Sequence, residues 1–288
     1  MPSADENIST DTEKGERIAK YLARAGIASR RGAEKLIEEG RISLNGETVK
    51  TPATFVKDGD QVALDGENIG PKEETRLWLY HKPKGLVTTH HDPQGRSTVF
   101  DQLPSGLPRV ISIGRLDINT EGLLLLTNDG ELAGRLENPA TGWKRRYRAR
   151  AYGTPEESKL KAIREGVTID GTRYAPADIE IETRTGANLW IAIGVREGKY
   201  REVRHILEFA GLQVNRLIRV SFGPFQLGSL KAGEVKEVPH RVLKEQIGED
   251  GIQKPRAPRS KDGKAKDNKT SNNKPRNKKA RHAPDRRR

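Results

Sequence analysis

The chain has 288 residues, of which 53 are Lys or Arg and 40 are Asp or Glu, giving a formal net charge of +13. This length allows one large domain or two smaller ones with well-formed cores. Cysteine is absent, which excludes disulfides, thiolate nucleophiles and cysteine-ligated zinc or iron–sulfur sites.

The first sixteen residues are polar and acidic, whereas a secretory signal needs a basic start followed by an apolar core. The longest aliphatic run, residues 123–126, falls far short of the roughly 20 residues that a membrane-spanning helix requires. We therefore expect residues 1–16 to be a disordered extension. The protein itself is expected to be soluble, cytoplasmic and free of membrane contact.

Most of the excess positive charge lies near the C-terminal end. Residues 251–288 hold 15 of the 53 basic residues and 3 of the 40 acidic ones, which leaves 38 against 37 in the rest of the chain. Because Ile252 is the one large aliphatic residue there, we expect a disordered basic tail, which we place over residues 245–288. Such a tail either only aids solubility or adds salt-dependent affinity for nucleic-acid phosphates without choosing a target.

A first small domain is predicted over residues 17–70. Apolar residues at helical spacing predict a helix over residues 18–25, which Gly26 ends. Ser29 is the predicted N-cap of a second helix over residues 30–39.

Short strands are expected to follow these two helices. Alternating apolar residues meet Asn45-Gly46, the strongest short-range signal for a tight hairpin. The alternation returns at Val62 and Leu64, so the sequence predicts two helices packed on a small sheet.

Basic side chains gather on the two predicted helices. Two arginines stand in the first turn of the second helix, where the helix dipole disfavours cations by a few tenths of a kcal/mol. A second basic row lies opposite the apolar stripe of the first helix. The rows either form a solvated face or present cations to a phosphate backbone. They comprise Arg17, Lys20, Arg24, Arg30 and Arg31.

The segment that carries these features reads GERIAKYLARAGIASRRGAEKLIEEGRISLNGETV and resembles the S4 RNA-binding domain over nearly the whole unit. In that family the two helices carry the RNA-facing side. The resemblance therefore implies that the five basic residues bind RNA.

A polar linker is predicted over residues 71–76, and a second domain over residues 77–244. Strands dominate this domain without strict β-α-β alternation, and several are too uniformly apolar to lie at a sheet edge. The sequence thus predicts an α+β protein, in which a small S4-like domain is followed by a mainly antiparallel mixed sheet. The expected strands are 77–80, 110–113, 123–126, 147–152 and 189–195, and the expected helices are 131–137, 155–165 and 200–209.

The most informative stretch covers residues 113–130, IGRLDINTEGLLLLTNDG, where a polar loop is bracketed by two apolar strands. An Asp beside Asn and Gly is usually a turn former. Here Arg115, Asp117 and Glu121 concentrate charge at the ends of buried strands. This arrangement favours a functional site over a simple connector.

The same loop matches the G-R-L-D-x-x-[ST]-x-G-L-[LI]-L-[LF]-[TS]-x-D-G signature of the RsuA-like pseudouridine synthases, and the similarity extends over about residues 77–242. The resemblance implies isomerisation of a uridine in ribosomal RNA without a cofactor. With the S4-like unit and the basic tail, the chain is most similar to the branch that acts on the large ribosomal subunit. That similarity implies a uridine in 23S rRNA, and the same chemistry on 16S rRNA stays open.

Carried over by position, the resemblance makes Asp117 the catalytic carboxylate and Tyr147, in KRRYRARAYG, the aromatic residue that packs against the target base. In REGKYREVRHILEFAGLQVNRLIRVSFGP, Arg204 matches the basic residue that pairs with the catalytic Asp, and Leu217 matches an apolar residue of the pocket. The more frequent motif is E-G-x-N-R-Q-V-R-R-[ML]. This chain departs from it at Tyr200, Glu202, His205 and Ile206.

Pseudouridine formation breaks the bond from ribose C1′ to base N1, turns the detached uracil, and joins C1′ to C5. Asp117 either attacks C1′ or removes a proton from C2′, and the sequence does not separate these routes. A guanidinium partner such as Arg204 favours the ionised form of a carboxyl group. Arg115 is a second candidate, because it could hold a phosphate or fill the space that the flipped base vacates.

Tyr147 is either a buried strand aromatic or a flat wall for a flipped-out base. Its basic neighbours favour the second interpretation, because such a base is stacked beside its own phosphates. Lys144, Arg145 and Arg146 are therefore expected to contact RNA.

Lys199 and Arg201 follow a Glu197-Gly198 turn and are also expected to contact RNA, although a solvated helix face is the alternative.

The six histidines show no metal-ligand spacing, and neither a Walker A loop nor a dinucleotide-binding motif is present, so we expect no metal and no cofactor. The expected partner is ribosomal RNA or a pre-ribosomal particle, bound by a monomer. Two alternatives remain: a non-catalytic RNA-binding ribosome-assembly factor, and a stress or translation factor with an unrelated second domain.

Overall fold

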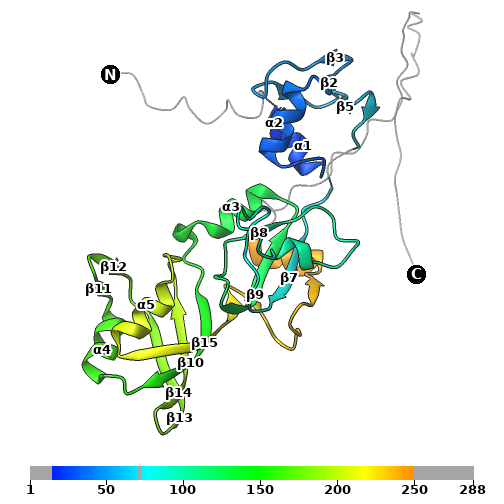
Figure 1. Cartoon of the computed structure of the whole chain (residues 1–288). Coiled ribbons are helices and arrows are strands. Elements are labelled where there is room, and N and C mark those ends of the chain that lie inside the picture. The colour runs from blue at the N-terminus through cyan, green and yellow to red at the C-terminus, as the bar shows by residue number, and fades with distance from the viewer. Residues whose placement is uncertain (1–14, 71–72, 249–288) are drawn as a thin grey trace, which may run out of the picture. The chain divides into compact units, whose positions relative to one another are not determined.

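The structure is a computed structural model that describes residues 15–70 and 73–248 (Figure 1). We treat these two parts separately. Residues 1–14 of the extension predicted over residues 1–16, and residues 249–288 of the basic tail predicted over residues 245–288, lie outside the described residues.

The smaller part, residues 15–70, contains two helices and short strands, as expected. Ile18 and Leu22 of the first helix pack against Ala33 and Ile37 of the second in one core. The Ser29 Oγ accepts a hydrogen bond from the Gly32 N–H at 2.9 Å, as an N-cap does. The elements are β1 Glu16–Arg17, α1 Ile18–Arg24, α2 Arg30–Glu38, β2 Ile42–Leu44, β3 Glu47–Thr48, β4 Phe55–Val56, β5 Val62–Leu64 and β6 Glu67–Asn68.

The four-stranded sheet of this part has the order β3-β2-β5-β6, and β1 pairs separately with β4. The predicted hairpin joins β2 to β3. Both of its turn residues have positive φ, 53° at Asn45 and 86° at Gly46, as a type I′ turn requires.

The larger part, residues 73–248, is built on a nine-stranded sheet with the main order β13-β14-β10-β15-β9-β7-β17. In addition, β8 pairs with β9, and β16 pairs with β15. The strands are β7 Leu77–Lys82, β8 Ile111–Ile113, β9 Thr120–Thr127, β10 Arg145–Gly153, β13 Asp178–Thr185, β14 Asn188–Val195, β15 Leu212–Phe222, β16 Phe225–Gln226 and β17 Val235–Glu237. A separate hairpin consists of β11 Val167–Ile169 and β12 Thr172–Tyr174.

Helices complete the larger part: α4 packs against β13 and α5 against β15 (Figure 1). No helix in the described part of the chain combines the length and apolarity needed to cross a bilayer. The helices are α3 Gly130–Glu137, α4 Glu157–Glu165, α5 Glu202–Phe209 and α6 His240–Ile247, with 3-10 turns at Phe100–Gln102 and Pro139–Thr141.

All strand pairs of the large sheet are antiparallel except β15 with β9, so the predicted α+β class and mainly antiparallel mixed sheet are confirmed. The parallel pair depends on a glycine. Gly122 of β9 has φ 101°, and a Cβ there would lie 2.3 Å from the Arg219 carbonyl oxygen of β15. The sequence did not lead us to expect β13, β15 or β17.

Strand β9 is buried on both faces, because its leucines alternate between two cores. Leu123 and Leu125 belong to a core with Phe222, whereas Leu124 and Leu126 pack with Trp78 on the other face. The loop that precedes β9 is therefore attached to one of the most constrained strands of the described chain.

The structure corrects three predicted boundaries. Glu16, placed in the disordered extension, pairs with Val56 in a strand. Thr75, placed in the linker, is buried and donates a hydrogen bond to Asp129 at 2.7 Å. Residues 245–247, placed in the tail, form the last turn of α6. Each error has the same cause, because a short polar segment was assigned by composition while its tertiary contacts could not be seen.

Candidate active site

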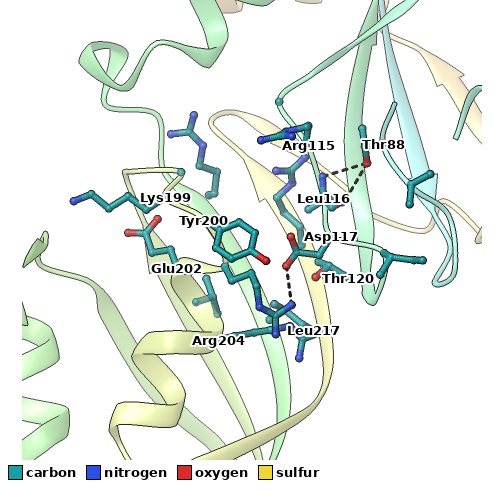
Figure 2. A pocket seen from close by; sticks show the side chains of 18 of the residues that line it. Thr88, Arg115, Leu116, Asp117, Thr120, Lys199, Tyr200, Glu202, Arg204 and Leu217 are labelled. Carbon is teal, nitrogen blue, oxygen red and sulfur yellow. Dashed lines mark hydrogen bonds and ion pairs between the residues drawn. The ribbon is translucent and has the colours of Figure 1, made fainter. Parts of the chain in front are cut away.

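A cavity of about 740 Å³ opens beside the loop before β9, between β10, β15 and the start of α5 (Figure 2). Basic side chains outnumber carboxylates along its wall. It brings together all five side chains that the sequence proposed for catalysis: Arg115, Asp117, Tyr147, Arg204 and Leu217.

The loop that carries Asp117 is clamped through its backbone. The Thr88 hydroxyl donates to the Leu116 carbonyl at 2.9 Å and accepts from the Leu116 N–H at 3.3 Å (Figure 2). The Gly85 N–H donates to the Ile118 carbonyl at 2.8 Å. These contacts fix the backbone on either side of Asp117 before any ligand binds.

Lys82 also holds the Asp117 loop, through hydrogen bonds to backbone carbonyls. Its side chain is fully buried at the end of β7, and its ammonium donates to the carbonyls of Pro83 at 3.1 Å, Asp117 at 3.2 Å and Thr120 at 3.0 Å. Burial lowers the pKa of Lys82 to about 8, although the Asp117 carboxylate opposes this effect. The sequence did not lead us to this residue, which is the last one of strand β7.

The Asp117 carboxylate pairs with Arg201, not with the expected Arg204. An Asp117 carboxylate oxygen (Oδ2) lies 3.7 Å from an Arg201 guanidinium nitrogen, and both side chains are about one-third exposed, at 32% and 34%. The prediction of an Asp117–Arg204 pair is wrong at this point. Sequence matching located the correct segment of the chain but selected Arg204 in place of Arg201, three positions earlier.

Backbone geometry explains why Arg201 is aimed at the cavity. Arg201 has φ 48° and ψ 29°, a left-handed conformation that costs a non-glycine residue on the order of 1 kcal/mol. Its carbonyl accepts the N–H groups of Arg204 and His205 at 3.0 and 3.1 Å, which starts α5. The strained residue thus begins a helix and presents a cation to Asp117.

Arg204 lies one helical turn further on and is buried, with 7% of its surface exposed. Its guanidinium donates to the Val214 carbonyl at 3.2 Å and to the Asn119 carbonyl at 3.1 Å. Burial, reinforced by the nearby Arg201 cation, lowers the pKa of Arg204, while the Asp117 carboxylate raises it. Arg204 therefore ties the Asp117 loop to β15 and α5 and acts on the carboxylate through the field of its charge.

Tyr147 and Leu217 supply the apolar lining. Tyr147 of β10 is half-buried and packs against the two cores on either side of the cavity. Leu217 of β15 is buried and pairs with Thr120 in the parallel ladder that follows the Asp117 loop. A flat ring and an aliphatic side chain therefore share one cavity with the carboxylate.

Two buried arginines form another part of the wall. Arg145 stacks over the Phe222 ring at 4.7 Å and donates to the Arg196 carbonyl at 2.7 Å. Arg219 lies 5.3 Å from the same ring and donates to the Leu123 carbonyl at 2.7 Å. Arg145 was expected on an RNA-facing surface, but the structure places its guanidinium inside, because β10 turns every second side chain inward.

Glu202 is a buried carboxyl that the sequence did not identify as functional. It is 5% exposed, lines the cavity and has one side-chain oxygen without a hydrogen-bond partner among the described residues. Burial, with the nearby Glu197 carboxylate, raises the pKa of Glu202 to about 7. The family motif has an uncharged Gln at this position.

The other proposed RNA-binding residues lie in varied surroundings. Arg146 is exposed on β10, Lys144 pairs with Asp178, and Lys199 pairs with Glu197 at 2.9 Å. In the smaller part, Lys20 and Arg24 lie 3.6 and 3.5 Å from Glu16, whereas Arg17, Arg30 and Arg31 are exposed. Arg115 is exposed at the mouth of the cavity.

The cavity can hold a flat polar ring against Tyr147 with a carboxylate beside it, under a rim of arginines that can contact phosphates. Within residues 15–70 and 73–248, no group of three His, Asp or Glu side chains is placed to hold a metal ion.

Comparisons with known proteins identify the family of the chain. The sequence model of the family described as RNA pseudouridylate synthase matches residues 76–209, and that of the S4 domain matches residues 16–62. A solved structure described as a crystal structure of pseudouridylate synthase is 26% identical, with a TM-score of 0.57, covering 81% of this chain and 100% of that one.

Similar sequences carry the same description. An uncharacterized RNA pseudouridine synthase of Rickettsia prowazekii (strain Madrid E) is 48% identical over 231 residues, covering 80% of this chain and 97% of the relative. A ribosomal large subunit pseudouridine synthase B of Yersinia pestis is 41% identical over 219 residues, covering 74% of this chain and 69% of the relative. The chain therefore belongs to the RNA pseudouridine synthases, a family of isomerases, and carries an N-terminal S4 domain.

Proposed function

We propose that this enzyme isomerises one specific uridine of 23S rRNA to pseudouridine and that Asp117 is its catalytic carboxylate. The observation that carries the proposal is the shared cavity, in which Asp117 lies beside Tyr147 and Leu217 with the Arg201 guanidinium 3.7 Å from its carboxylate. Support for the RNA target comes from the Yersinia pestis relative, whose name assigns it to the large ribosomal subunit.

The proposed reaction balances within the substrate. The C1′–N1 bond breaks, the uracil turns, the C1′–C5 bond forms, and the proton lost from C5 is balanced by one gained at N1. Asp117 assists either by attacking C1′ or by removing a proton from C2′, and both routes need the ionised carboxylate. Because nothing is oxidised or reduced, the proposal includes no cofactor.

Each neighbour of Asp117 receives a distinct role. Arg201 pairs with the carboxylate and favours its ionised form. Tyr147 is the flat wall against which the detached uracil turns, and Leu217 closes the apolar side of the cavity against water. The exposed Arg115 is placed to contact a phosphate of the extruded nucleotide.

Delivery of RNA is assigned to the S4 domain, whose exposed Arg30 and Arg31 are suited to phosphate contacts. We further propose that the enzyme acts as a cytoplasmic monomer on rRNA or on a pre-ribosomal particle. The alternative of a non-catalytic assembly factor is set aside, because the chain belongs to a family of enzymes.

The decisive experiment maps pseudouridines across 16S and 23S rRNA from cells that contain the wild-type protein, no protein, or the Asp117→Asn variant. Asn keeps the shape of the side chain but removes its charge, so one 23S site should vanish in the last two strains.

Asp178→Asn provides a matched control, because it makes the same change at a largely exposed β13 residue. This variant should retain the site, since an exposed ion pair contributes only about 0–1 kcal/mol. A complete map in the Asp117→Asn strain would contradict the catalytic assignment, and loss of a 16S site would contradict the RNA target.

A further inference from the structure

A second cavity, of about 660 Å³, adjoins the candidate active site and shares Lys199 and Tyr200 with it. Figure 2 shows both residues on the turn that borders the active-site cavity. Aromatic rings and two carboxylates dominate the rest of the second cavity, which is lined by Ile169, Asp170, Thr172, Tyr174, His205, Glu208 and Phe209.

Tyr200 has the environment of a stacking platform. It is 78% exposed, the highest value among the exposed large hydrophobic side chains of the described chain. Burial in a core does not account for an aromatic ring at this position, where the family motif has Asn. An exposed ring beside an RNA-modifying site can offer a face to a nucleobase, whose stacking does not depend strongly on sequence.

Three ring side chains that line the second cavity, Tyr174, His205 and Tyr200, contact one another. The Tyr174 hydroxyl and the His205 Nδ1 are 3.0 Å apart, and the Tyr200 and His205 rings meet edge to face with centroids 6.3 Å apart. Tyr174 is itself buried. His205 thus links a fixed ring to the exposed one, which holds Tyr200 at the border of the two cavities.

The charges of this cavity favour a base over a phosphate. Asp170 and Glu208 are exposed carboxylates, and they repel a phosphodiester. They accept hydrogen bonds from an exocyclic amino group, which adenine, guanine and cytosine carry and uracil lacks. Lys199 stands on the side shared with the active site, where it can contact the phosphate that joins two neighbouring nucleotides.

We propose that this second cavity binds the nucleobase next to the isomerised uridine, and that it prefers a base with an exocyclic amino group. In this arrangement Tyr200 separates the two bases: the target uridine enters the cavity of Asp117, and its neighbour stacks on the other side of the ring. The inference rests on the proposed function, because it takes the first cavity to hold the target uridine.

The test measures initial rates of the full-length enzyme on an in vitro transcribed rRNA fragment that contains the mapped uridine. Removing the stacking ring with Tyr200→Ala should raise KM by about 10- to 100-fold, with kcat changed less than threefold. Tyr200→Phe should keep the wild-type KM, because it retains the ring. Tyr152→Ala, which removes an exposed ring from β10 outside both cavities, should also leave KM unchanged.

Combining changes in the enzyme with changes in the RNA tests whether Tyr200 contacts the neighbouring base directly. Two RNA fragments are compared, with an abasic nucleotide either 5′ or 3′ of the target uridine. One of the two replacements should raise KM for the wild type by the same factor as Tyr200→Ala does, about 10- to 100-fold, and should not raise KM further for Tyr200→Ala. Replacing the amino group of that neighbour by hydrogen should raise KM for the wild type but not for the double variant Asp170→Asn, Glu208→Gln. If neither abasic replacement raises KM more for the wild type than for Tyr200→Ala, the subsite is refuted.

This failure is distinguishable from failure of the proposed function. The KM comparison uses whichever RNA the mapping identifies, and it needs product formation by the wild type and the variants compared with it, all of which retain Asp117. Product formation by Asp117→Asn would overturn the catalytic assignment while leaving the Tyr200 comparison intact.

Discussion

The two walls of the active-site cavity differ in how firmly contacts within the protein hold them. The wall that carries Asp117 is held by a buried ammonium, a hydroxyl and a parallel strand pair. The facing turn carries an exposed Tyr200 and the strained Arg201. The comparison indicates that Asp117, proposed for chemistry, is preorganised, whereas Tyr200, proposed to stack on a base, stands on an exposed turn where it can adapt.

The largest effect is expected from removing the clamp of the rigid wall. Lys82→Met deletes the ammonium that three carbonyls accept from, so those carbonyls lose their partner in a buried place. We expect the free energy of unfolding to fall by about 2 kcal/mol. Because the Asp117 loop shifts, kcat should fall by about 100-fold or more, with little change in RNA affinity.

Urea unfolding and single-turnover kinetics check this prediction. Lys84→Met is the matched control, because it makes the same substitution two residues away at an exposed position. Wild-type kcat in Lys82→Met would show that Asp117 needs no such support, and the contrast between the walls would disappear.

The rigid wall was also the part that the sequence predicted best. Apolar runs indicated β7 and β9, and charge at the end of a buried run indicated the Asp117 loop, because both signals are local. Strand β15 was missed although it is the longest strand in residues 15–70 and 73–248, since polar residues such as Asn215 and Arg216 interrupt its apolar pattern. Its place in the sheet is set by parallel pairing with β9, a contact between distant segments.

The facing turn was predicted only in outline. The family motif indicated Arg204 as the partner of Asp117 and left Arg201 as an RNA contact, whereas the pairing with Arg201 depends on a left-handed backbone that no residue pattern predicts. Lys82 and Glu202 were missed because burial gives them their roles, and burial of a charged side chain is invisible in composition.

A second test separates the two arginines. Arg204→Ala removes a buried guanidinium from two backbone carbonyls, so the free energy of unfolding should fall by about 2 kcal/mol and kcat by roughly 100-fold. Arg201→Ala removes a partly exposed ion pair, so unfolding should change by less than about 1 kcal/mol while kcat falls about tenfold.

Both variants are assayed by urea unfolding and single-turnover kinetics, with Arg241→Ala as the control because its side chain is 90% exposed on α6. Equal losses of stability in Arg201→Ala and Arg204→Ala would mean that the partly exposed Arg201 is as integrated into the fold as the buried Arg204 that holds the Asp117 loop. That result would remove the distinction between a rigid and an adaptable side.

The last prediction concerns stability alone and involves Glu202, the buried carboxyl at the boundary between the walls. Its pKa is raised from 4.5 to about 7 in the folded protein, so the folded state holds this proton more tightly than the unfolded state does. Stability from this group is fully present below pH 4.5 and is lost as the pH rises through 7. Relative to Glu202→Gln, the wild type should therefore lose unfolding free energy between pH 5 and pH 8, by no more than roughly 3 kcal/mol.

Urea unfolding of both proteins at several pH values between 5 and 8 checks this, with Glu157→Gln, a change at a 79% exposed residue, as the control. The difference between the wild type and Glu202→Gln should be smallest at pH 5 and should grow toward pH 8, because the folded wild type holds an uncharged Glu202 at the lower pH and an ionised one at the higher pH. A constant difference at all pH values would show that Glu202 does not titrate in this range. The cavity wall would then hold an ionised carboxylate beside Arg145, and the neutral Gln of the family motif would not be its functional equivalent.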